Sequence, residues 1–463
     1  MTASDFRRGL ARSSVIVIII VIALAGVAGI YYFTKTSPPQ NSSTLSISGS
    51  LTVVAISGFN DAVIKQQAAD FMKAYPSVTV NVVDLTYAQL LTSYITAFKA
   101  NSSIYDVLSV PVTPLGNLYP YLLDLSPYIS NPQYFPPSYN LSDIFPSTLS
   151  LYRVQDKLVA LPIVTDVLML YFRPSLFQNS TNREAFLNTY GYPMPYPGNT
   201  TLTLTQLVDL ANFFNGAHGS KYGIDIMSDS RPYDMVQSYM TIMASLRENS
   251  VSQFGNVINP YGSIFSNDNK VLVNSSLGIE ALSIYVQLVR DSEAPLSTSF
   301  ETAPEYFANG DTAMMVFWTE TAHELATTKT AIGNDWAIAP IFPGGTTAQG
   351  GTAMAVYKYS HNIPAAVKFV EFVTSPQESS LPFQLQSLPP FRISVVNQFE
   401  KNNTYLVAIG SNIEHSVLGA ALNGYFPQFS TALTTEFPSI YDGQVSPSVG
   451  AAIIASQFYK SIG

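Results

Sequence analysis

The stretch LTVVAISG, residues 51–58, decides how the folded part of the chain begins. It is a short apolar run rich in β-branched residues that ends at a glycine, which is typical of a buried strand. A helical spacing of apolar residues follows over 61–75, and a second helix is expected over 88–100. Further strands are expected at 77–85 and 105–110. Strand, helix, strand, helix, strand predicts a parallel sheet with crossover helices, and therefore an α/β fold.

The residues directly after these strands are candidates for ligand contact. In open parallel sheets, ligands bind beyond the carboxyl ends of the strands, which here are Ser57–Asn60 and Pro111–Gly116. Asn60 carries both a hydrogen-bond donor and an acceptor, so it suits a polar ligand. An asparagine in front of a helix is also a common N-cap, and both interpretations of Asn60 stay open.

Length and composition indicate a protein of two lobes or domains with few surface charges. At 463 residues the chain is longer than one ordinary core requires. Only 11% of the residues are charged, against roughly 25% in typical soluble proteins. The charge of such a surface would change little as carboxylates become protonated at low pH. The low charge therefore fits adaptation to an acidic medium, and it fits simple compositional drift equally well. The net charge of −9 and the lack of a basic cluster in the body exclude nucleic acid as a partner.

The amino-terminal region predicts a membrane segment. An uncharged apolar run, VIVIIIVIALAGVAGIYYF, occupies residues 15–33 and follows three arginines. It is long enough to cross roughly 30 Å of hydrocarbon as a helix, and the arginines place the amino terminus in the cytoplasm. We therefore expect a leader or transmembrane helix over 1–33, a Ser/Thr/Pro tether over 34–50, and a body anchored at the extracellular face of the cell membrane.

Acceptor triplets for N-glycosylation are spread along the chain, which fits an exported glycoprotein. They begin at Asn41, Asn101, Asn140, Asn179, Asn199, Asn274 and Asn402.

No pattern in the sequence predicts catalysis, a metal or a cofactor. The chain has no cysteine, and its four histidines are scattered without ligand spacing. The G-x-S-x-G and H-E-x-x-H motifs are missing, as is a glycine-rich phosphate loop. No segment places two carboxylates in an evident pair of the kind that a glycosidase uses. We therefore expect a protein that is not an enzyme.

Five segments, taken in order, resemble the sugar-type extracellular solute-binding proteins of ATP-driven (ABC-type) importers, the family that contains maltodextrin-binding proteins. The resemblance covers about residues 50–463. The segments are YDVLSV (105–110), DKLVALPIVTDVLMLYFRPSLF (156–177), FANGDTAMMVFW (307–318), QGGTAMAVYKYSHNIPAAVKFVEFVTSPQES (349–379) and YDGQVSPSVGAAI (441–453).

The resemblance implies two α/β lobes that close on a ligand by a hinge motion. The crossing segments place lobe one at 50–165 plus 353–400 and lobe two at 166–352 plus 401–463. The implied partners are a carbohydrate ligand and the membrane permease of an ABC importer.

Three residues near the crossing segments are the leading candidates for sugar contact. Sugar recognition needs flat aromatic faces and side chains that hydrogen-bond hydroxyls in pairs. Trp318 stands where the family carries a stacking aromatic residue, although a tryptophan in the core is the simpler structural interpretation. Asp166 matches an acidic ligand contact of maltodextrin-binding relatives, and Glu320 would be an acceptor at the rim. Each carboxylate could instead lie in solvent.

Further candidates come from the same resemblance. Tyr233 and Arg231 align with the wall of lobe two, and Phe426 could close the cleft from the carboxyl-terminal segment. Gly351 permits a close backbone approach at the return crossing, as a plain turn also would. Thr113 stands where relatives often carry an acidic side chain, and this departure puts specificity for maltodextrin in doubt.

The leader adds to the resemblance, and rival functions remain open. RRGLARSSVIVIII (7–20) is similar to prepilin-like leaders on sugar-binding proteins of some archaea, with cleavage expected after Gly9; an uncleaved anchor predicts the same location. One rival is a binding protein for a peptide or another small polar solute. The other is a surface-anchored structural or adhesive protein, against which the length of the α/β pattern argues.

Overall fold

The computed structural model describes residues 45–199, 201–231, 233–250, 263–266, 270–418 and 424–463. The expected membrane helix at 15–33, the cleavage point after Gly9 and most of the tether lie outside the described residues. Within the described ranges, no helix is both long and apolar enough to cross a bilayer.

The strands are short except for two that carry the chain between the halves of the fold. They are β1 (Gly49–Ile56), β2 (Val78–Leu85), β3 (Val107–Pro111), β4 (Arg153–Val154), β5 (Lys157–Leu158), β6 (Leu161–Phe172), β7 (Tyr222–Ile226), β8 (Thr312–Trp318), β9 (Ala337–Ile338), β10 (Thr347–Val356) and β11 (Ser416–Leu418).

The helices fall into two groups along the chain. Those before and around the first crossing are α2 (Asp61–Ala74), α3 (Tyr87–Lys99), α4 (Leu115–Leu118), α5 (Ser126–Ile129), α6 (Pro146–Leu151), α7 (Pro174–Gln178), α8 (Ser180–Tyr190) and α9 (Leu204–Phe214). The later ones are α10 (Asp234–Ser250), α11 (Ser276–Arg290), α12 (Thr302–Asn309), α13 (Thr321–Thr327), α14 (Ile363–Val373), α15 (Leu381–Gln386), α16 (Ile393–Phe399), α17 (Tyr405–Glu414), α18 (Phe426–Tyr441) and α19 (Pro447–Ile462).

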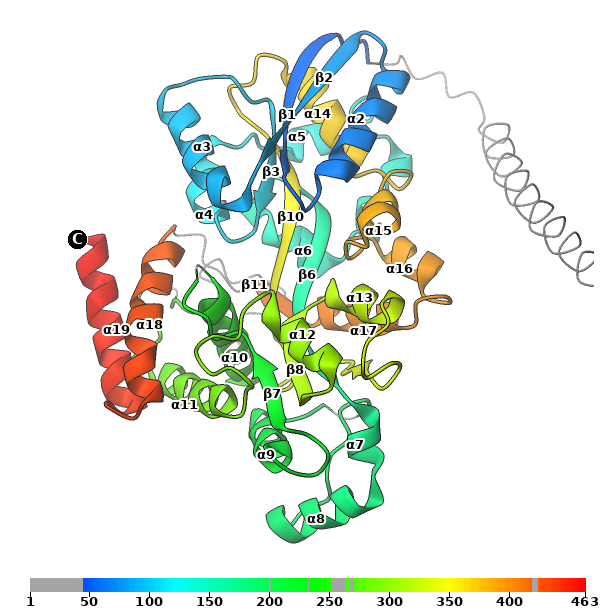
Figure 1. Ribbon diagram of the computed structural model, residues 1–463. Helices are drawn as coiled ribbons and strands as arrows, with labels where there is room; N and C mark the ends of the chain where they lie inside the picture. Colours follow the sequence, from blue (N-terminus) through cyan, green and yellow to red (C-terminus); the bar gives the residue numbers. More distant parts are fainter. Residues whose placement is uncertain (1–44, 200, 232, 251–262, 267–269, 419–423) are drawn as a thin grey trace, which may run out of the picture. The chain divides into compact units, whose positions relative to one another are not determined.

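One mixed sheet runs through both halves of the body. Among the described residues its main path is β2-β1-β3-β10-β6-β8-β7, with β11 beside β10 and β9 beside β6. The pair β1 and β2 is parallel, whereas β10 runs antiparallel to both β3 and β6. The strands β6 and β10 thus carry the backbone from the β1–β3 half to the β7–β8 half, which makes two α/β lobes joined at crossing strands (Figure 1).

The first lobe forms because its strands are apolar on both faces. From Val53 to Ile56 every residue of β1 is buried, and β3 is buried throughout. Such strands need helices on both sides of the sheet. The helices α2 and α14 pack against each other and against β1, and the apolar face of α2 includes Val63, Ala68 and Phe71.

The second lobe is built around β8, whose seven residues TAMMVFW are all buried. It lies between β6 and the parallel strand β7. The helices α9 and α11 contact β7, and α19 packs against both α18 and α11 (Figure 1).

The α/β class expected from the sequence is confirmed, and most element positions hold. The helix expected at 88–100 is α3, which begins and ends one residue earlier, and the helix expected at 61–75 ends one residue earlier in α2. The structured body begins earlier than expected, because Ile47 is buried and β1 starts at Gly49, whose N–H donates to the carbonyl of Ser77. This hydrogen bond to the residue before β2 extends β1 into the segment that was expected to be part of the tether.

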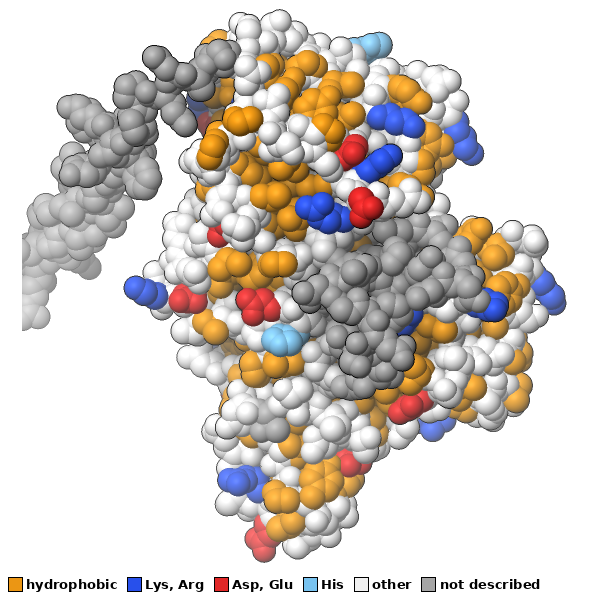
Figure 2. All heavy atoms as spheres, turned by 180° about the vertical axis from the view of Figure 1, so that it is seen from behind, with side chains coloured by type: hydrophobic (Ala, Val, Ile, Leu, Met, Phe, Trp, Pro, Cys, Tyr) orange, Lys and Arg blue, Asp and Glu red, His pale blue; other side chains and the backbone are white. Residues whose placement is uncertain are grey.

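The surface matches the low charge of the sequence. Figure 2 shows one face on which uncharged polar and apolar side chains predominate, with lysine, arginine and carboxylate side chains mostly singly or in small groups. This agrees with the composition, in which charged residues are 11% of the chain.

Candidate ligand-binding cleft

A cavity of about 490 Å³ lies where the two lobes meet, and we call it the cleft cavity. Its first-lobe wall follows the carboxyl ends of β1 and β3 and includes Ser57, Phe59 and Thr113. Its second-lobe wall includes Trp318 at the end of β8 and Tyr233 just before α10. The location agrees with the rule that ligands bind beyond the carboxyl ends of parallel strands.

The register of the crossing strands brings two carboxyl groups together. In the antiparallel pair of β6 and β8, Leu168 lies opposite Trp318. The pairing ends there, and Glu320 follows β8 by two residues; a side-chain hydrogen bond joins it to Asp166. Thr319, between Trp318 and Glu320, also holds Asp166, since its N–H donates to Oδ1 of Asp166 at 3.1 Å and its hydroxyl donates to the same oxygen. Both carboxyls line the cleft cavity.

Trp318 belongs to the core and also borders the cleft cavity. Its side chain belongs to the hydrophobic core and is only 6% exposed, yet its ring also lines the cleft cavity. The indole lies against Gly350, where an added Cβ would come within 3.0 Å of Cζ3. A glycine is therefore what allows the ring to lie against β10.

Gly351 has a separate backbone reason to be glycine. Its φ of +108° is outside the range that other residues adopt comfortably. An added Cβ would also lie 2.5 Å from the carbonyl oxygen of Val164 on β6. Gly351 lines the cleft cavity, so the expected close backbone approach occurs here.

Electrostatics in the cleft cavity favour carboxyls that keep a proton. Burial raises the pKa of Asp166 to about 7, and hydrogen bonds from Thr319 oppose the shift. Burial also raises the pKa of Glu320 well above its usual range, and the neighbouring Asp166 charge adds to this. Oε2 of Glu320 is buried without a hydrogen-bond partner. None of the described side chains that line the cavity belongs to Lys, Arg or His.

Tyr233 presents an aromatic ring from the second lobe, held by other rings. Its φ of +85° is unusual for a tyrosine and marks a strained backbone at the cavity wall. Its ring centroid lies 5.3 Å from that of Phe426 and 6.3 Å from that of Tyr87. Phe426 is buried behind Tyr233 and does not line the cavity, so its role is to support that ring.

Two other candidates from the sequence also lie away from the cavity wall. Asn60 is buried; its Oδ1 accepts from the N–H of Ile56 at 2.7 Å, and its Nδ2 donates to Oγ of Ser109 at 3.3 Å. It occupies the N-cap position of α2 without a side-chain cap bond, so it connects β1 to β3 instead. Arg231 is exposed and ion-paired with Glu301 at 2.7 Å.

The cavity also includes residues that sequence reasoning did not single out as contacts. Tyr87 begins α3 directly after the carboxyl end of β2, so the strand-end rule could have found it. Phe300 comes from an irregular segment before α12, where no periodicity points to it, and its ring packs on Phe317 at 5.2 Å.

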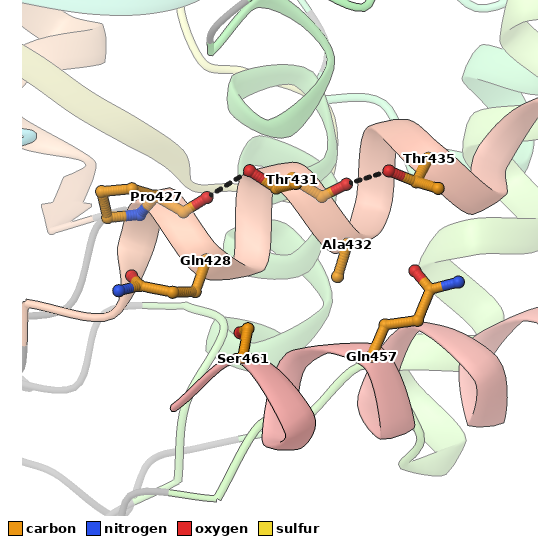
Figure 3. Close-up of a pocket in the computed structure, with 7 residues that line it drawn as sticks. All are labelled: Pro427, Gln428, Thr431, Ala432, Thr435, Gln457 and Ser461. Atoms are coloured by element: carbon orange, nitrogen blue, oxygen red, sulfur yellow. Dashed lines mark hydrogen bonds between the residues drawn. The ribbon is translucent and has the colours of Figure 1, made fainter. Parts of the chain in front are cut away.

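Two further hollows in the described part of the chain differ from the cleft cavity. One, of about 560 Å³, shares Phe300, Glu301 and Glu320 with it but includes neither Trp318 nor Asp166. A groove of about 310 Å³ between α18 and α19 is lined by small and amide side chains, among them Thr431, Thr435 and Gln457 (Figure 3). The threonine hydroxyls there are already used, since Thr435 donates to the carbonyl of Thr431 at 2.7 Å. In the described part of the chain, no group of three or more potential ligands is arranged to hold a metal ion.

The fold and this cleft cavity define a bilobed binding protein of the solute-capturing class. The chain belongs to the bacterial extracellular solute-binding protein family, whose model matches residues 57–379. The members of this family are binding proteins, in agreement with the expectation that the chain is not an enzyme.

Relatives and solved structures agree with this family. A probable ABC transporter-binding protein of Deinococcus radiodurans is 26% identical over 295 residues, which is 62% of this chain and 62% of that protein. Maltose-bound MalE3 of T. maritima has a TM-score of 0.67 at 21% identity, covering 89% of this chain and 99% of its own. The sugar-binding protein MalE of Xanthomonas citri has a TM-score of 0.70 at 17% identity, covering 89% and 98%.

Proposed function

We propose that this chain is the extracellular substrate-binding subunit of an ABC importer, which captures a sugar or oligosaccharide between its lobes and delivers it to a membrane permease. The family supports the transport role. The protein of Deinococcus radiodurans that resembles it is described as a probable ABC transporter-binding protein, and MalE3 of T. maritima binds maltose.

The single observation that carries this proposal is the pairing of an indole with two carboxyls on one wall. Trp318 supplies an apolar surface on which the C–H face of a pyranose can lie. Asp166 and Glu320 adjoin it and can hydrogen-bond hydroxyl groups. Tyr233 on the second-lobe wall and Tyr87 on the first-lobe wall supply further rings. The hydroxyl of Tyr87 lies within hydrogen-bonding reach of Thr113.

A panel of neutral carbohydrates tests the proposal. Maltose, maltotetraose, D-glucose, D-mannitol and ribitol are titrated against the protein while intrinsic tryptophan fluorescence and thermal stability are followed. Trp318 and Trp336 are the two indoles, and a sugar in the cleft cavity should alter the emission of Trp318. The Trp336→Phe variant should keep the fluorescence response, whereas Trp318→Phe should lose it. Binding that raises Tm but leaves Trp318 emission unchanged would place the ligand elsewhere.

Two further parts of the proposal concern the membrane anchor and the boundaries of the lobes. We expect residues 1–33 to hold the protein at the cell surface, either as an uncleaved helix or after cleavage of the leader following Gly9. We also expect the lobes to divide at 165/166 in β6 and 352/353 in β10. The second division is supported by a register shift between Thr352 and Ala353 where β10 pairs with β6. Fractionation of cells that express the full chain and a chain starting at Leu45 tests the anchor.

A further inference from the structure

The cleft cavity contains four carboxyl groups, and they differ in how their charge is balanced. Glu301 is ion-paired with Arg231 at 2.7 Å. Burial raises the pKa of Asp234 to about 6, although a hydrogen bond from the N–H of Phe300 at 3.0 Å and the charge of Arg231 both oppose the shift. Asp166 and Glu320 have no cationic partner among the described residues. The uncompensated charge of the cavity is therefore concentrated in this one pair.

Backbone geometry forces the pair together. Asp166 lies on β6 opposite Gly350 of β10. Glu320 follows β8 by two residues, at the start of α13, and a side-chain hydrogen bond joins it to Asp166. Two adjacent carboxyls in a desolvated site do not both ionise readily. Thr319 satisfies only one oxygen of Asp166, while Oε2 of Glu320 remains buried and unpartnered.

A neighbouring hollow of about 560 Å³ shares Glu320 and is also lined by Lys329, but no ion pair among the described residues joins Lys329 to Asp166 or Glu320. The other titratable groups near the pair are Tyr171 on β6, Glu305 on α12, His323 and Glu324 on α13, and Tyr405 on α17. The Tyr171 hydroxyl donates to the carbonyl of Trp318 at 2.7 Å, so it is already used. Burial lowers the pKa of His323, which is therefore neutral near pH 7. Glu324 adds a further negative charge.

We propose that Asp166 and Glu320 bind the ligand as one unit that shares a single proton, which selects neutral polyhydroxylated ligands over acidic ones and makes their capture depend on pH. This inference rests on the proposed function, since it concerns the same cavity. In the singly protonated state the unit carries both an O–H donor and carboxylate acceptors, so it can satisfy both roles of a sugar hydroxyl. When the proton leaves, the two carboxylates repel each other and the donor is lost.

The expected behaviour is a loss of affinity as pH rises. If only the protonated unit binds, the dissociation constant should increase by up to about tenfold per pH unit above the pH at which the proton leaves. For a ligand that carries an ammonium group, affinity should instead increase as pH rises, because the cation would bind the doubly ionised pair. An acidic sugar should be rejected at every pH, since no basic side chain among the described residues lines the cavity.

The test measures dissociation constants by calorimetry from pH 5 to pH 9. The probes are D-glucose, D-glucosamine and D-glucuronate, which differ in charge, and maltose with its acid analogue maltobionate. Wild-type protein should bind the neutral probe more weakly at pH 9 than at pH 6, by at least about tenfold. Glu320→Gln and Asp166→Asn each leave one carboxylate beside a permanent amide donor, so both should bind with a flat pH profile. Glu324→Gln is the matched control and should keep the wild-type profile.

The outcomes separate this inference from the proposed function. If no carbohydrate in either panel binds at any pH, the proposed function fails and this inference fails with it. If a neutral sugar binds wild-type protein with a flat profile, or if Glu320→Gln and Asp166→Asn both keep the wild-type slope, only the shared-proton unit is wrong. Stronger binding of D-glucosamine as pH rises from 5 to about 7, where its amine is still charged, would replace it with recognition of a cation.

Discussion

Gly350 and Trp318 are in direct contact across the cleft cavity wall, since a Cβ at position 350 would approach Cζ3 of the indole to 3.0 Å. The absence of a side chain on β10 thus allows the ring to lie flat next to Asp166, which pairs with Gly350 in the sheet. The position of the proposed stacking surface therefore depends on a glycine from a distant strand.

Substitutions at the two neighbouring glycines should separate binding from folding. Gly350→Ala has an ordinary backbone conformation and should displace the indole by a few tenths of an ångström, which lowers ligand affinity with little change in Tm. Gly351→Ala meets both a φ of +108° and the carbonyl of Val164 at 2.5 Å, so it should lower the free energy of unfolding by about 1–3 kcal/mol. Denaturant unfolding and ligand titration of both variants check this. Equal stability losses at the two positions would contradict it.

Truncation of Trp318 should affect both affinity and stability. The sequence predicts that Trp318→Ala removes most of the affinity without unfolding the protein, but a side chain that is 6% exposed also contributes to the core. We expect a stability loss of about 3–5 kcal/mol alongside the loss of sugar binding. Trp318→Phe should keep most of the stability while weakening binding. Calorimetric binding at a temperature well below the Tm of each variant distinguishes the two effects, and retained affinity in Trp318→Ala would contradict the stacking role.

Asn60 should matter for stability and not for ligand contact. Asn60→Ala leaves the N–H of Ile56 without its side-chain acceptor and removes the bond to Ser109. A buried hydrogen-bond partner lost in this way costs about 1–3 kcal/mol. Thermal unfolding should show this loss, while the dissociation constant of the folded variant stays within about threefold of wild type. A large drop in affinity at unchanged Tm would instead support direct ligand contact by Asn60.

Buried carboxyls predict that the protein becomes more stable as the medium becomes more acidic. Burial raises the pKa of Asp225 and of Glu378 to about 7, and that of Asp291 to about 6. Each keeps a proton in the folded state at pH values where the unfolded chain has released it. The stabilising contribution of these three carboxyls to the free energy of unfolding is therefore fully present below about pH 4, and it is lost as pH rises through about 6 to 7.

Scanning calorimetry between about pH 2 and pH 8 checks this sign. We expect Tm to be higher at pH 5 than at pH 8 by at least about 3 °C. Asp225→Asn retains an acceptor for the N–H of Glu293, which Oδ1 of Asp225 binds at 3.1 Å, and it should flatten part of the profile. A Tm that falls steadily from pH 8 to pH 5, or a steep loss below pH 4, would contradict adaptation to acid.

Much of the fold was predictable because it depends on local pattern. Apolar runs with β-branched residues indicate β1, β2 and β3, and the spacing of apolar residues indicates the helix α2. The strand-end rule also located the segments after β1 and β3, and its extension to β2 would have found Tyr87. Phe300 could not be found in this way, because no periodic element carries it to the cavity.

The three expected contact residues that do not line the cavity differ from the others in how their side chains pack. Asn60 and Phe426 follow or begin regular elements and carry suitable side chains, but both are buried on the far side of the residues that line the cavity. Arg231 is paired at the surface with Glu301, which itself lines the cavity. Sequence position identifies the segment that reaches a cleft, while side-chain direction depends on packing against neighbours.

By itself, the amino-acid sequence determined the α/β class, the order of strands and helices, the family resemblance, and the presence of a tryptophan and two carboxylates near the crossing segments. Only the tertiary structure decided that Asp166 and Glu320 face each other and that Gly350 lies under the indole. The reason is that pairing between strands distant in the chain depends on the register of the whole sheet, which local periodicity does not specify.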